Sequence, residues 1–336
     1  MKLSFVIPAY NEEAYLPICL EAVCAEKKKG KYDMEIIVVN NASTDNTRKV
    51  ALSYPGVICV DEPKKGLSAA RQAGFLSATG DLIANIDSDS VLTPGWVDTV
   101  MDSFSKNPRL IALSGPFIFH DFSIGHNLLV RIQYLIDYYF YFVNRFIFRI
   151  SSLLQGGNFV IRKTALDQIG GFNPEFPFWG EDTNIAKRLN PLGPVVFTFK
   201  LPIYSSGRRL KKGGTVRTTI RYSLNYFSTI FFNKPFSVSY NDIRQSEINQ
   251  DRFRTDLAGF NTALVYAKLI SAILIFNLFG GVAFVWDRML ENIQPITASA
   301  SVMSIDDHLV LDKVHSSVVK VKEKIKNLGE KFSKDE

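Results

Sequence analysis

The stretch LIANIDSDS, residues 82–90, decides how the rest of the chain is interpreted, because an apolar run ends there in Asp87 and Asp89. Residues 82–86 have the length and composition of a short buried strand. The two aspartates follow that strand, and in open α/β sheets ligands bind beyond the carboxyl ends of strands. Oxygen-only ligands favour a hard cation such as Mg²⁺ or Mn²⁺, which would hold nucleotide phosphates. A plain polar turn is the alternative for this stretch alone.

Apolar runs alternate with segments of helical spacing on both sides of this stretch. The predicted strands are 3–7, 35–39, 57–60 and 82–86, and the predicted helices are 16–25, 45–53, 66–78 and Pro94 to Lys106. We expect Ser43 to be the N-cap of the second helix. This order is typical of an α/β protein with a doubly wound, mostly parallel sheet. Each polar strand-to-helix loop would open on the same edge of that sheet.

The second half of the chain has more aromatic residues. A fifth strand is predicted at 111–119, and further elements are a strand after Gly156-Gly157, short helices at 165–169 and up to Leu189, a strand at 195–199 and a basic, mobile loop at 205–214. Residues 128–154 are apolar with scattered charges. They fit an amphipathic helix on a membrane, a helix covering an acceptor groove, or an ordinary buried helix.

Composition narrows the classes of function. The chain has 336 residues, 46% of them hydrophobic and 21% charged, and a formal charge of +6. This mild basic excess suits phosphates or an anionic membrane surface, and the sequence has no nucleic-acid-binding motif. Its three cysteines lie in apolar segments and are expected to be reduced. The chain begins directly in a strand pattern, so we expect a cytosolic start.

The C-terminal part suggests contact with a membrane. Residues 263–286 are long enough to cross a bilayer and carry one charge, Lys268. Because the tail that follows is rich in lysine, a re-entrant or interfacial helix, or packing against 128–154, remains an alternative to a single crossing. The polar tail has the spacing of an amphipathic helix. We therefore expect membrane association at the cytoplasmic face of the cell membrane, with a single pass left open.

We predict four parts along the chain. These are a catalytic domain at 1–215 with a nucleotide-binding half (1–110) and an acceptor half (111–215), a linker with membrane-proximal helices at 216–262, a hydrophobic helix at 263–286 and a polar tail at 287–336.

Seven short motifs occur in one order, and together they resemble the family-2 glycosyltransferases, which bind nucleotide-diphospho-sugars with the GT-A fold. The motifs are Val6 to Glu12, Ile36 to Asp45, Gly66 to Arg71, Asp87-Ser88-Asp89, Gly156-Gly157-Asn158, Gly170-Gly171-Phe172 and Gly180-Glu181-Asp182. Each motif is weak alone, but their order is specific. They cover about the first two-thirds of the chain.

The resemblance implies a role for each matching residue. The nucleoside pocket would be lined by Pro8, Ala9, Tyr10 and Glu12, with Asn41 against the base or ribose and Arg71 near the base or diphosphate. Asp87 would lie at the ribose and metal, and Asp89 would bind the Mn²⁺ or Mg²⁺ ion. Asp182 would be the general base and Glu181 its neighbour.

Two departures from the family pattern affect donor recognition. The family usually carries an aspartate where this chain has Asn40-Asn41, which leaves the donor nucleotide open. Many members have a His or a Gln-x-x-Arg-Trp motif beyond the base, and the corresponding segment here is expected to be 205–209, which contains Arg208 and Arg209. Either arginine could clamp the diphosphate, with the glycine-flanked loop closing over the donor.

The resulting expectation is a metal-dependent inverting glycosyltransferase. It would move a sugar from a nucleotide-diphospho-sugar to the hydroxyl of a saccharide or lipid-linked acceptor, in cell-envelope polysaccharide or glycolipid synthesis. Such a displacement needs a base for the acceptor proton and a cation for the departing diphosphate. The alternatives are a polyprenyl-phosphate sugar synthase and an inactive sugar-nucleotide-binding or assembly protein. A nucleotidyltransferase is disfavoured because the loop after the first strand is acidic.

Overall fold

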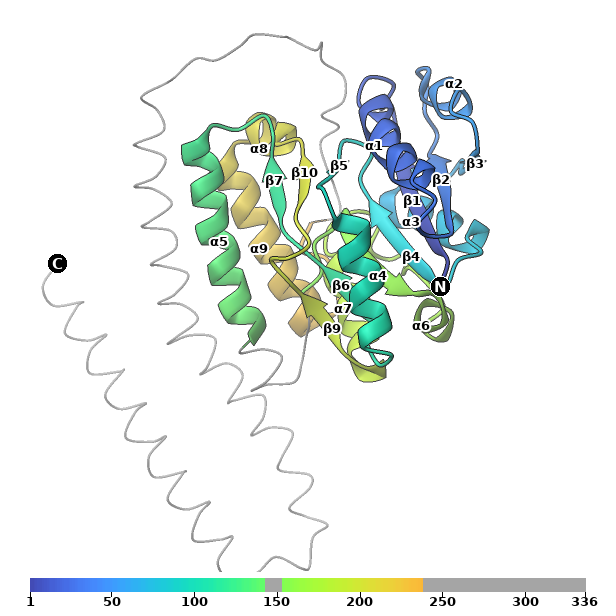
Figure 1. Cartoon of the computed structure of the whole chain (residues 1–336). Helices are drawn as coiled ribbons and strands as arrows, with labels where there is room; N and C mark the ends of the chain where they lie inside the picture. The colour runs from blue at the N-terminus through green and yellow to red at the C-terminus, as the bar shows by residue number, and fades with distance from the viewer. Residues whose placement is uncertain (143–152, 238–336) are drawn as a thin grey trace, which may run out of the picture. The chain divides into compact units, whose positions relative to one another are not determined.

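The computed structural model describes residues 1–142 and 153–237. Its larger sheet has seven strands (Figure 1). In spatial order they are β3 (Val57–Asp61), β2 (Met34–Asn40), β1 (Leu3–Ala9), β4 (Leu82–Ile86), β8 (Asn158–Arg162), β6 (Ala112–Ser114) and β9 (Val195–Phe197). All neighbours are parallel except those of β8, which runs antiparallel to both β4 and β6. The expected α/β class with a mostly parallel sheet is confirmed.

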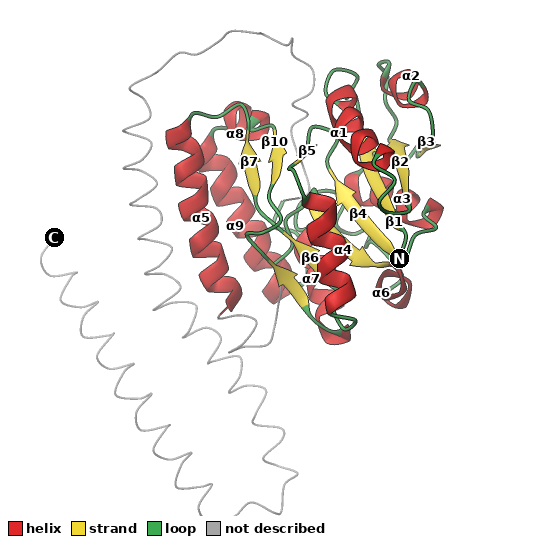
Figure 2. Cartoon of the chain, viewed as in Figure 1, coloured by secondary structure: helices red, strands yellow, loops and turns green. Residues whose placement is uncertain are grey.

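Helices cover both faces of this sheet (Figure 2). One face packs against α1 (Leu16–Lys28), α2 (Thr47–Leu52) and α4 (Trp96–Lys106), and the other against α3 (Leu67–Ser77), α6 (Lys163–Gln168) and α7 (Glu181–Leu189). Successive side chains of a strand point to opposite faces, so Phe5 packs in the first core and Val6 in the second. Every residue of β1, β2 and β4 is therefore buried.

A second, smaller sheet lies beside the first. Its strands are β5 (Val91–Leu92), β10 (Ile203–Ser205) and β7 (Phe117–Phe119). The prediction of one strand at 111–119 is wrong, because the chain leaves the large sheet after β6 and joins the small sheet as β7. Gly115 lies at the break, where an added Cβ would come within 2.0 Å of the Leu201 carbonyl oxygen.

The basic segment 205–214 is not the loop that we expected. It contains the end of β10 and the short helix α8 (Arg208–Gly213), and α9 (Thr215–Phe232) follows. Asp121 fixes the start of α8, since its carboxylate accepts hydrogen bonds from the Gly207 amide at 2.7 Å and the Ser206 hydroxyl at 3.1 Å. Lys211 pairs with the same carboxylate at 3.3 Å. A side chain far away in sequence thus orders the segment.

Two helix starts differ from the sequence prediction. Helix α4 begins at Trp96, after Gly95 at a φ of 78°, rather than at Pro94. Helix α2 begins after Asn46, and the Ser43 hydroxyl instead accepts a hydrogen bond from the Asn11 amide at 3.1 Å. Ser43 therefore joins the loop after β2 to the loop after β1 rather than capping a helix.

Helix α5 (Ile124–Phe142) includes the first part of the aromatic stretch predicted at 128–154. Tyr134 and Tyr141 are buried, whereas Leu128 and Leu135 are exposed. No helix within the described ranges has both the length and the apolarity to cross a membrane. The hydrophobic segment 263–286 and the tail lie outside the described residues, so these expectations stay predictions.

Candidate functional site

The end of β4 and the start of β8 meet at one edge of the large sheet. Because the two strands are antiparallel, with Ile86 opposite Asn158, the glycine pair before β8 lies beside Asp87. The Asp87 amide donates to the Gly157 carbonyl at 3.3 Å. A Cβ on Gly157, whose φ is +86°, would lie 2.1 Å from the Asp87 carboxylate. Glycine is therefore needed here for close approach as well as for its backbone conformation.

A buried arginine joins two acidic residues on either side of this edge. Arg71 of α3 is fully buried, and its guanidinium donates to Glu181 and, at 3.3 Å, to Asp87. A buried charge needs such partners. Burial raises the pKa of Glu181 to about 7, against the opposing effect of Arg71. Glu181 is thus enclosed and paired with Arg71, which in turn holds Asp87.

Asp182 lies on the other side of the glycine pair, in the first turn of α7. Its carboxylate accepts hydrogen bonds from the Gly156 amide at 3.1 Å and the Thr183 amide at 2.7 Å. Desolvation raises the pKa of Asp182, although these hydrogen bonds oppose the shift. Unlike Glu181, it is only partly buried. Asp182 therefore combines a raised pKa with access to a reactant.

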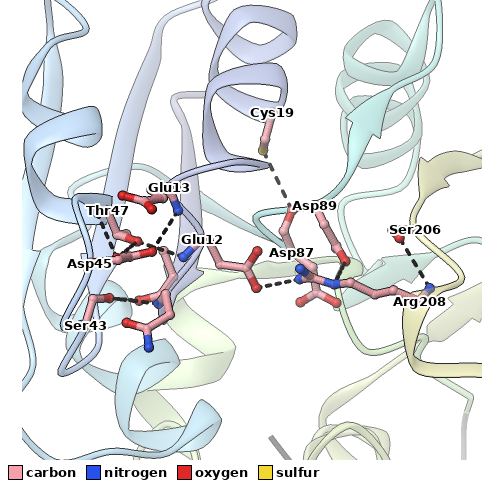
Figure 3. Close-up of polar contacts among 12 residues, drawn as sticks. Glu12, Glu13, Cys19, Ser43, Asp45, Thr47, Asp87, Asp89, Ser206 and Arg208 are labelled. Atoms are coloured by element: carbon pink, nitrogen blue, oxygen red, sulfur yellow. Dashed lines mark hydrogen bonds and ion pairs between the residues drawn. The ribbon is translucent and has the colours of Figure 1, made fainter. Parts of the chain in front are cut away.

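The small sheet brings Arg208 to Asp89. Tyr204 of β10 is paired with Val91 of β5 in an antiparallel register, so the residues after β10 meet those before β5. Arg208 Nε lies 3.1 Å from Asp89 Oδ2, and its Nη2 donates to Glu12 at 2.5 Å. Figure 3 shows this guanidinium reaching toward both carboxylates. Burial raises the pKa of Asp89 to about 7, with Arg208 opposing the shift and Glu12 adding to it.

The donor set at this edge fits a hard cation, because Asp87, Asp89 and Glu12 offer only oxygen ligands. Across the part of the chain that the structure describes, no three acidic, histidine or cysteine side chains converge as they would around an ion. Arg208 lies between Glu12 and Asp89 instead. Within this set, Asp87 and Asp89 are the two carboxylates that follow the end of β4.

The expected nucleoside wall lies at the ends of β1 and β2. Pro8 and Ala9 are buried in β1, and the Lys65 ammonium lies 3.8 Å from the centre of the Tyr10 ring. Asn41 is engaged with backbone, since its Nδ2 donates to the carbonyls of Glu62 and Lys64 and its Oδ1 accepts from the Gly66 amide. It therefore shapes the loop at residues 62–66.

A carboxylate that sequence reasoning missed stands beside Asn40. Asp61, at the end of β3, accepts a hydrogen bond from Asn40 Nδ2 at 2.8 Å and pairs with Arg48 at 3.0 Å. The structure thus places an acidic group next to the position where the family usually has one. The strand end itself was the available signal, because Asp61 is the last residue of β3 and Asp87 directly follows β4.

Arg208 and Arg209, either of which was expected to clamp the diphosphate, face different surroundings. The Arg209 guanidinium lies 4.4 Å from the centre of the Phe178 ring and 6.0 Å from that of Trp179. Arg221 of α9 approaches the same Trp179 ring at 5.6 Å, and Tyr222 meets it edge-on at 5.2 Å. Arg221 and Tyr222 were also missed, because the sequence predicts a linker with membrane-proximal helices for their segment.

Comparison with known proteins assigns the chain to a family. Residues 4–170 match the family described as glycosyl transferase family 2, and residues 145–206 match the N-terminal domain of galactosyltransferase. Chondroitin synthase of Escherichia coli is 27% identical over 221 residues, which are 56% of this chain and 32% of that protein. Dolichyl-phosphate beta-glucosyltransferase ALG5D of Trichomonas vaginalis is 38% identical over 143 residues, or 38% and 44% of the two chains. This chain thus spans less than half the length of either relative.

A solved structure has a similar fold. The mannosyltransferase PcManGT from Pyrobaculum calidifontis, in complex with GDP-Man and Mn²⁺, superposes with a TM-score of 0.51 at 16% identity. The match covers 94% of this chain and 80% of that one. The match to glycosyl transferase family 2 includes Arg71, Asp87, Asp89 and the glycine pair. The chain belongs to glycosyl transferase family 2.

Proposed function

We propose that the chain is an inverting glycosyltransferase that uses a divalent cation to transfer a sugar from a nucleotide-diphospho-sugar to an acceptor hydroxyl. The observation that carries this proposal is the glycine pair, which separates two acidic positions. On one side Asp87 lies next to the Gly157 backbone, and on the other Asp182 accepts a hydrogen bond from the Gly156 amide. With this spacing, Asp87 would face the diphosphate of a bound donor and Asp182 would face the acceptor.

The phosphate side suits a metal ion. Asp89 and Asp87 would hold Mn²⁺ or Mg²⁺, which would neutralise the charge that develops on the departing diphosphate. The similar mannosyltransferase structure, which contains Mn²⁺ and GDP-Man, supports this choice of ion and donor class. Arg208, which faces the same carboxylates, would turn its guanidinium to the diphosphate oxygens.

The acceptor side suits general base catalysis. Asp182 would take the proton from the acceptor hydroxyl while the oxygen of that hydroxyl forms a bond to the anomeric carbon. The bond from that carbon to the diphosphate breaks at the same time, and the diphosphate leaves with the electron pair. Desolvation raises the pKa of Asp182 towards the working pH, which is where the pKa of an effective general base lies. Glu181 acts indirectly, because it holds Arg71 against Asp87.

A second candidate function is the synthesis of a polyprenyl-phosphate sugar. The 38% identity with a dolichyl-phosphate glucosyltransferase over 143 residues favours it. There a phosphate oxygen would attack, and it needs little help from a base. A strong requirement for Asp182 would therefore argue for a hydroxyl acceptor. The remaining alternative, an inactive nucleotide-sugar-binding protein, predicts binding without turnover.

The test is thermal unfolding of the full chain with a series of nucleotide sugars, with and without Mn²⁺. A donor at 100 times its dissociation constant should stabilise the protein by about 2.7 kcal/mol, a rise of several degrees in Tm. Asp89→Ala should lose the Mn²⁺-dependent part of this shift. Asp98→Ala is the matched control, because Asp98 pairs with Lys31 at the surface. Stabilisation by no nucleotide sugar would overturn the proposal, and so would full turnover in excess EDTA.

We also propose that the protein works at the cytoplasmic face of a membrane, where nucleotide sugars are available, and that residues 263–286 attach it there. Cells expressing the full chain and a form cut after residue 256 should be fractionated. The full chain should resist extraction with alkaline carbonate, and the shortened form should become more soluble. Full-length protein recovered wholly in the soluble fraction would refute this part.

A further inference from the structure

Two arginines and two aromatic residues gather around Trp179, three positions before Asp182. Arg209 and Arg221 each lie within 6.0 Å of the centre of the indole ring, and Tyr222 packs against its edge. Arg209 also lies 4.4 Å from the centre of the Phe178 ring. Contacts with aromatic faces hold guanidinium groups in place without neutralising them.

The acidic groups of the site already have other partners. Glu181 and Asp87 are paired with Arg71, and Asp89 is paired with Arg208. Asp182 accepts backbone hydrogen bonds. Among the residues in the two described ranges, no carboxylate forms an ion pair with Arg209 or Arg221. Their positive charge is therefore available to a ligand.

The cluster has a fixed position relative to the proposed base. Gly180, at a φ of +72°, lies where an added Cβ would be 2.3 Å from the Thr229 hydroxyl, so the start of α7 is packed tightly against α9. Desolvation raises the pKa of Tyr222, Arg209 counters the shift and Asp182 adds to it. Tyr222 and Thr229 both belong to α9, so the close approach of Gly180 to Thr229 positions Tyr222 relative to the start of α7.

We propose that Arg209, Arg221 and Tyr222 form an acceptor subsite around Trp179 that binds a phosphate group of the acceptor. This inference rests on the proposed function and specifies its acceptor class. A neutral sugar would stack on an aromatic face, whereas here two guanidinium groups lie against the indole. Two planar guanidinium groups match the charge and the oxygen geometry of a phosphate monoester better than those of a single carboxylate.

The test measures binding of small phosphate probes to the full chain by calorimetry, with Mn²⁺ and a stabilising nucleoside diphosphate already bound. Glycerol phosphate represents a free phosphate, octyl phosphate a lipid phosphate and octanoate a carboxylate. Arg221→Ala should weaken binding of the phosphate probe about 10- to 100-fold, as expected for lost charge-assisted hydrogen bonds. Its affinity for the nucleoside diphosphate should stay the same. Arg209→Ala is the second variant, and Arg48→Ala, which breaks a surface ion pair, is the control.

The binding results distinguish a phosphate subsite from a carboxylate site and from a part of the donor site. Binding of both phosphates, or of octyl phosphate alone, supports the subsite; the second result identifies a lipid phosphate and favours the polyprenyl-phosphate function over a hydroxyl acceptor. Preference for octanoate overturns the choice of phosphate. An equal loss of nucleoside diphosphate affinity in Arg221→Ala would assign Arg221 to the donor and overturn the subsite. If the protein binds the nucleotide but none of the three probes, the subsite alone is refuted. If it binds no nucleotide, the proposed function on which the subsite rests is refuted as well.

Discussion

Removing Arg208 should change metal binding and nucleotide binding in opposite directions. Its guanidinium lies 3.1 Å from Asp89 and 2.5 Å from Glu12, and its side chain is 16% exposed. An ion held by Asp89 must first displace this guanidinium. Breaking one hydrogen-bonded ion pair of this kind costs about 1.5–3 kcal/mol. Arg208→Ala removes that cost, so Mn²⁺ alone should bind about 10- to 100-fold more tightly.

The nucleoside diphosphate should respond in the other way. With Mn²⁺ present, it loses a guanidinium partner in Arg208→Ala and should bind about 10-fold more weakly or worse. The titrations should be made at about pH 8.5, because Asp89 has a pKa of about 7 and loses the arginine that lowers it. Free Mn²⁺ can be followed by electron paramagnetic resonance, and nucleotide binding by calorimetry.

Lys211→Ala is the matched control on the same helix, because Lys211 pairs with Asp121 instead of the acidic edge. It should leave the affinity for Mn²⁺ unchanged. Weaker Mn²⁺ binding in Arg208→Ala would show that the arginine supports the ion rather than competing with it. Unchanged affinity for both ligands would refute the reasoning entirely.

Three further perturbations test the catalytic edge and the fold. Asp182→Asn should leave donor binding intact and lower transfer by roughly 10²–10⁴-fold in steady-state kinetics; near-normal turnover would make Asp182 a helix-end charge. Gly157→Ala should displace the Asp87 carboxylate and abolish Mn²⁺-dependent donor binding, whereas Gly95→Ala, with a similar φ but open space, should lower only Tm. Burial tends to raise the pKa of Glu35, but hydrogen bonds outweigh this effect and lower it from 4.5 to about 2. Glu35→Gln should therefore cost roughly 1–3 kcal/mol of unfolding free energy at pH 7. That deficit should close as pH falls from 4.5 towards 2, and a pH-independent deficit in urea unfolding would contradict the assignment.

The first four strands could be predicted because each is an apolar run closed by a polar loop. β8 was found, but its direction was not, because a short strand with an apolar centre, Phe159 to Ile161, has the same pattern in either orientation. β10 was missed because its last residue, Ser205, was assigned to the basic loop predicted at 205–214, which left only Ile203 and Tyr204. α8 was taken for a loop because glycines flank it, and the residue that orders it, Asp121, lies 85 positions from Ser206.

The candidate site shows the same division. Local patterns pointed to the strand end before Asp87 and to the helix start at Asp182. They could not show that Arg208 meets Glu12, 196 residues away, since that contact depends on the pairing of β5 with β10. Nor could adjacency in sequence show that Arg208 and Arg209 have different neighbours. Contacts across long separations come from topology, which local spacing does not encode.

The pair between Arg71 and Glu181 limits how far this protein can be taken apart or recombined. The two residues are 110 positions apart. In the large sheet, β4 is paired with β1 on one side and with β8 on the other. A fragment ending near residue 110 would keep a buried guanidinium without its carboxylate and would expose a strand edge that invites aggregation. Grafting an acceptor half from a relative onto residues 1–110 should therefore succeed only if the graft brings its own glutamate and glycine pair. Residues 1–110 therefore depend on contacts with Asn158–Arg162 and Glu181 for a complete core.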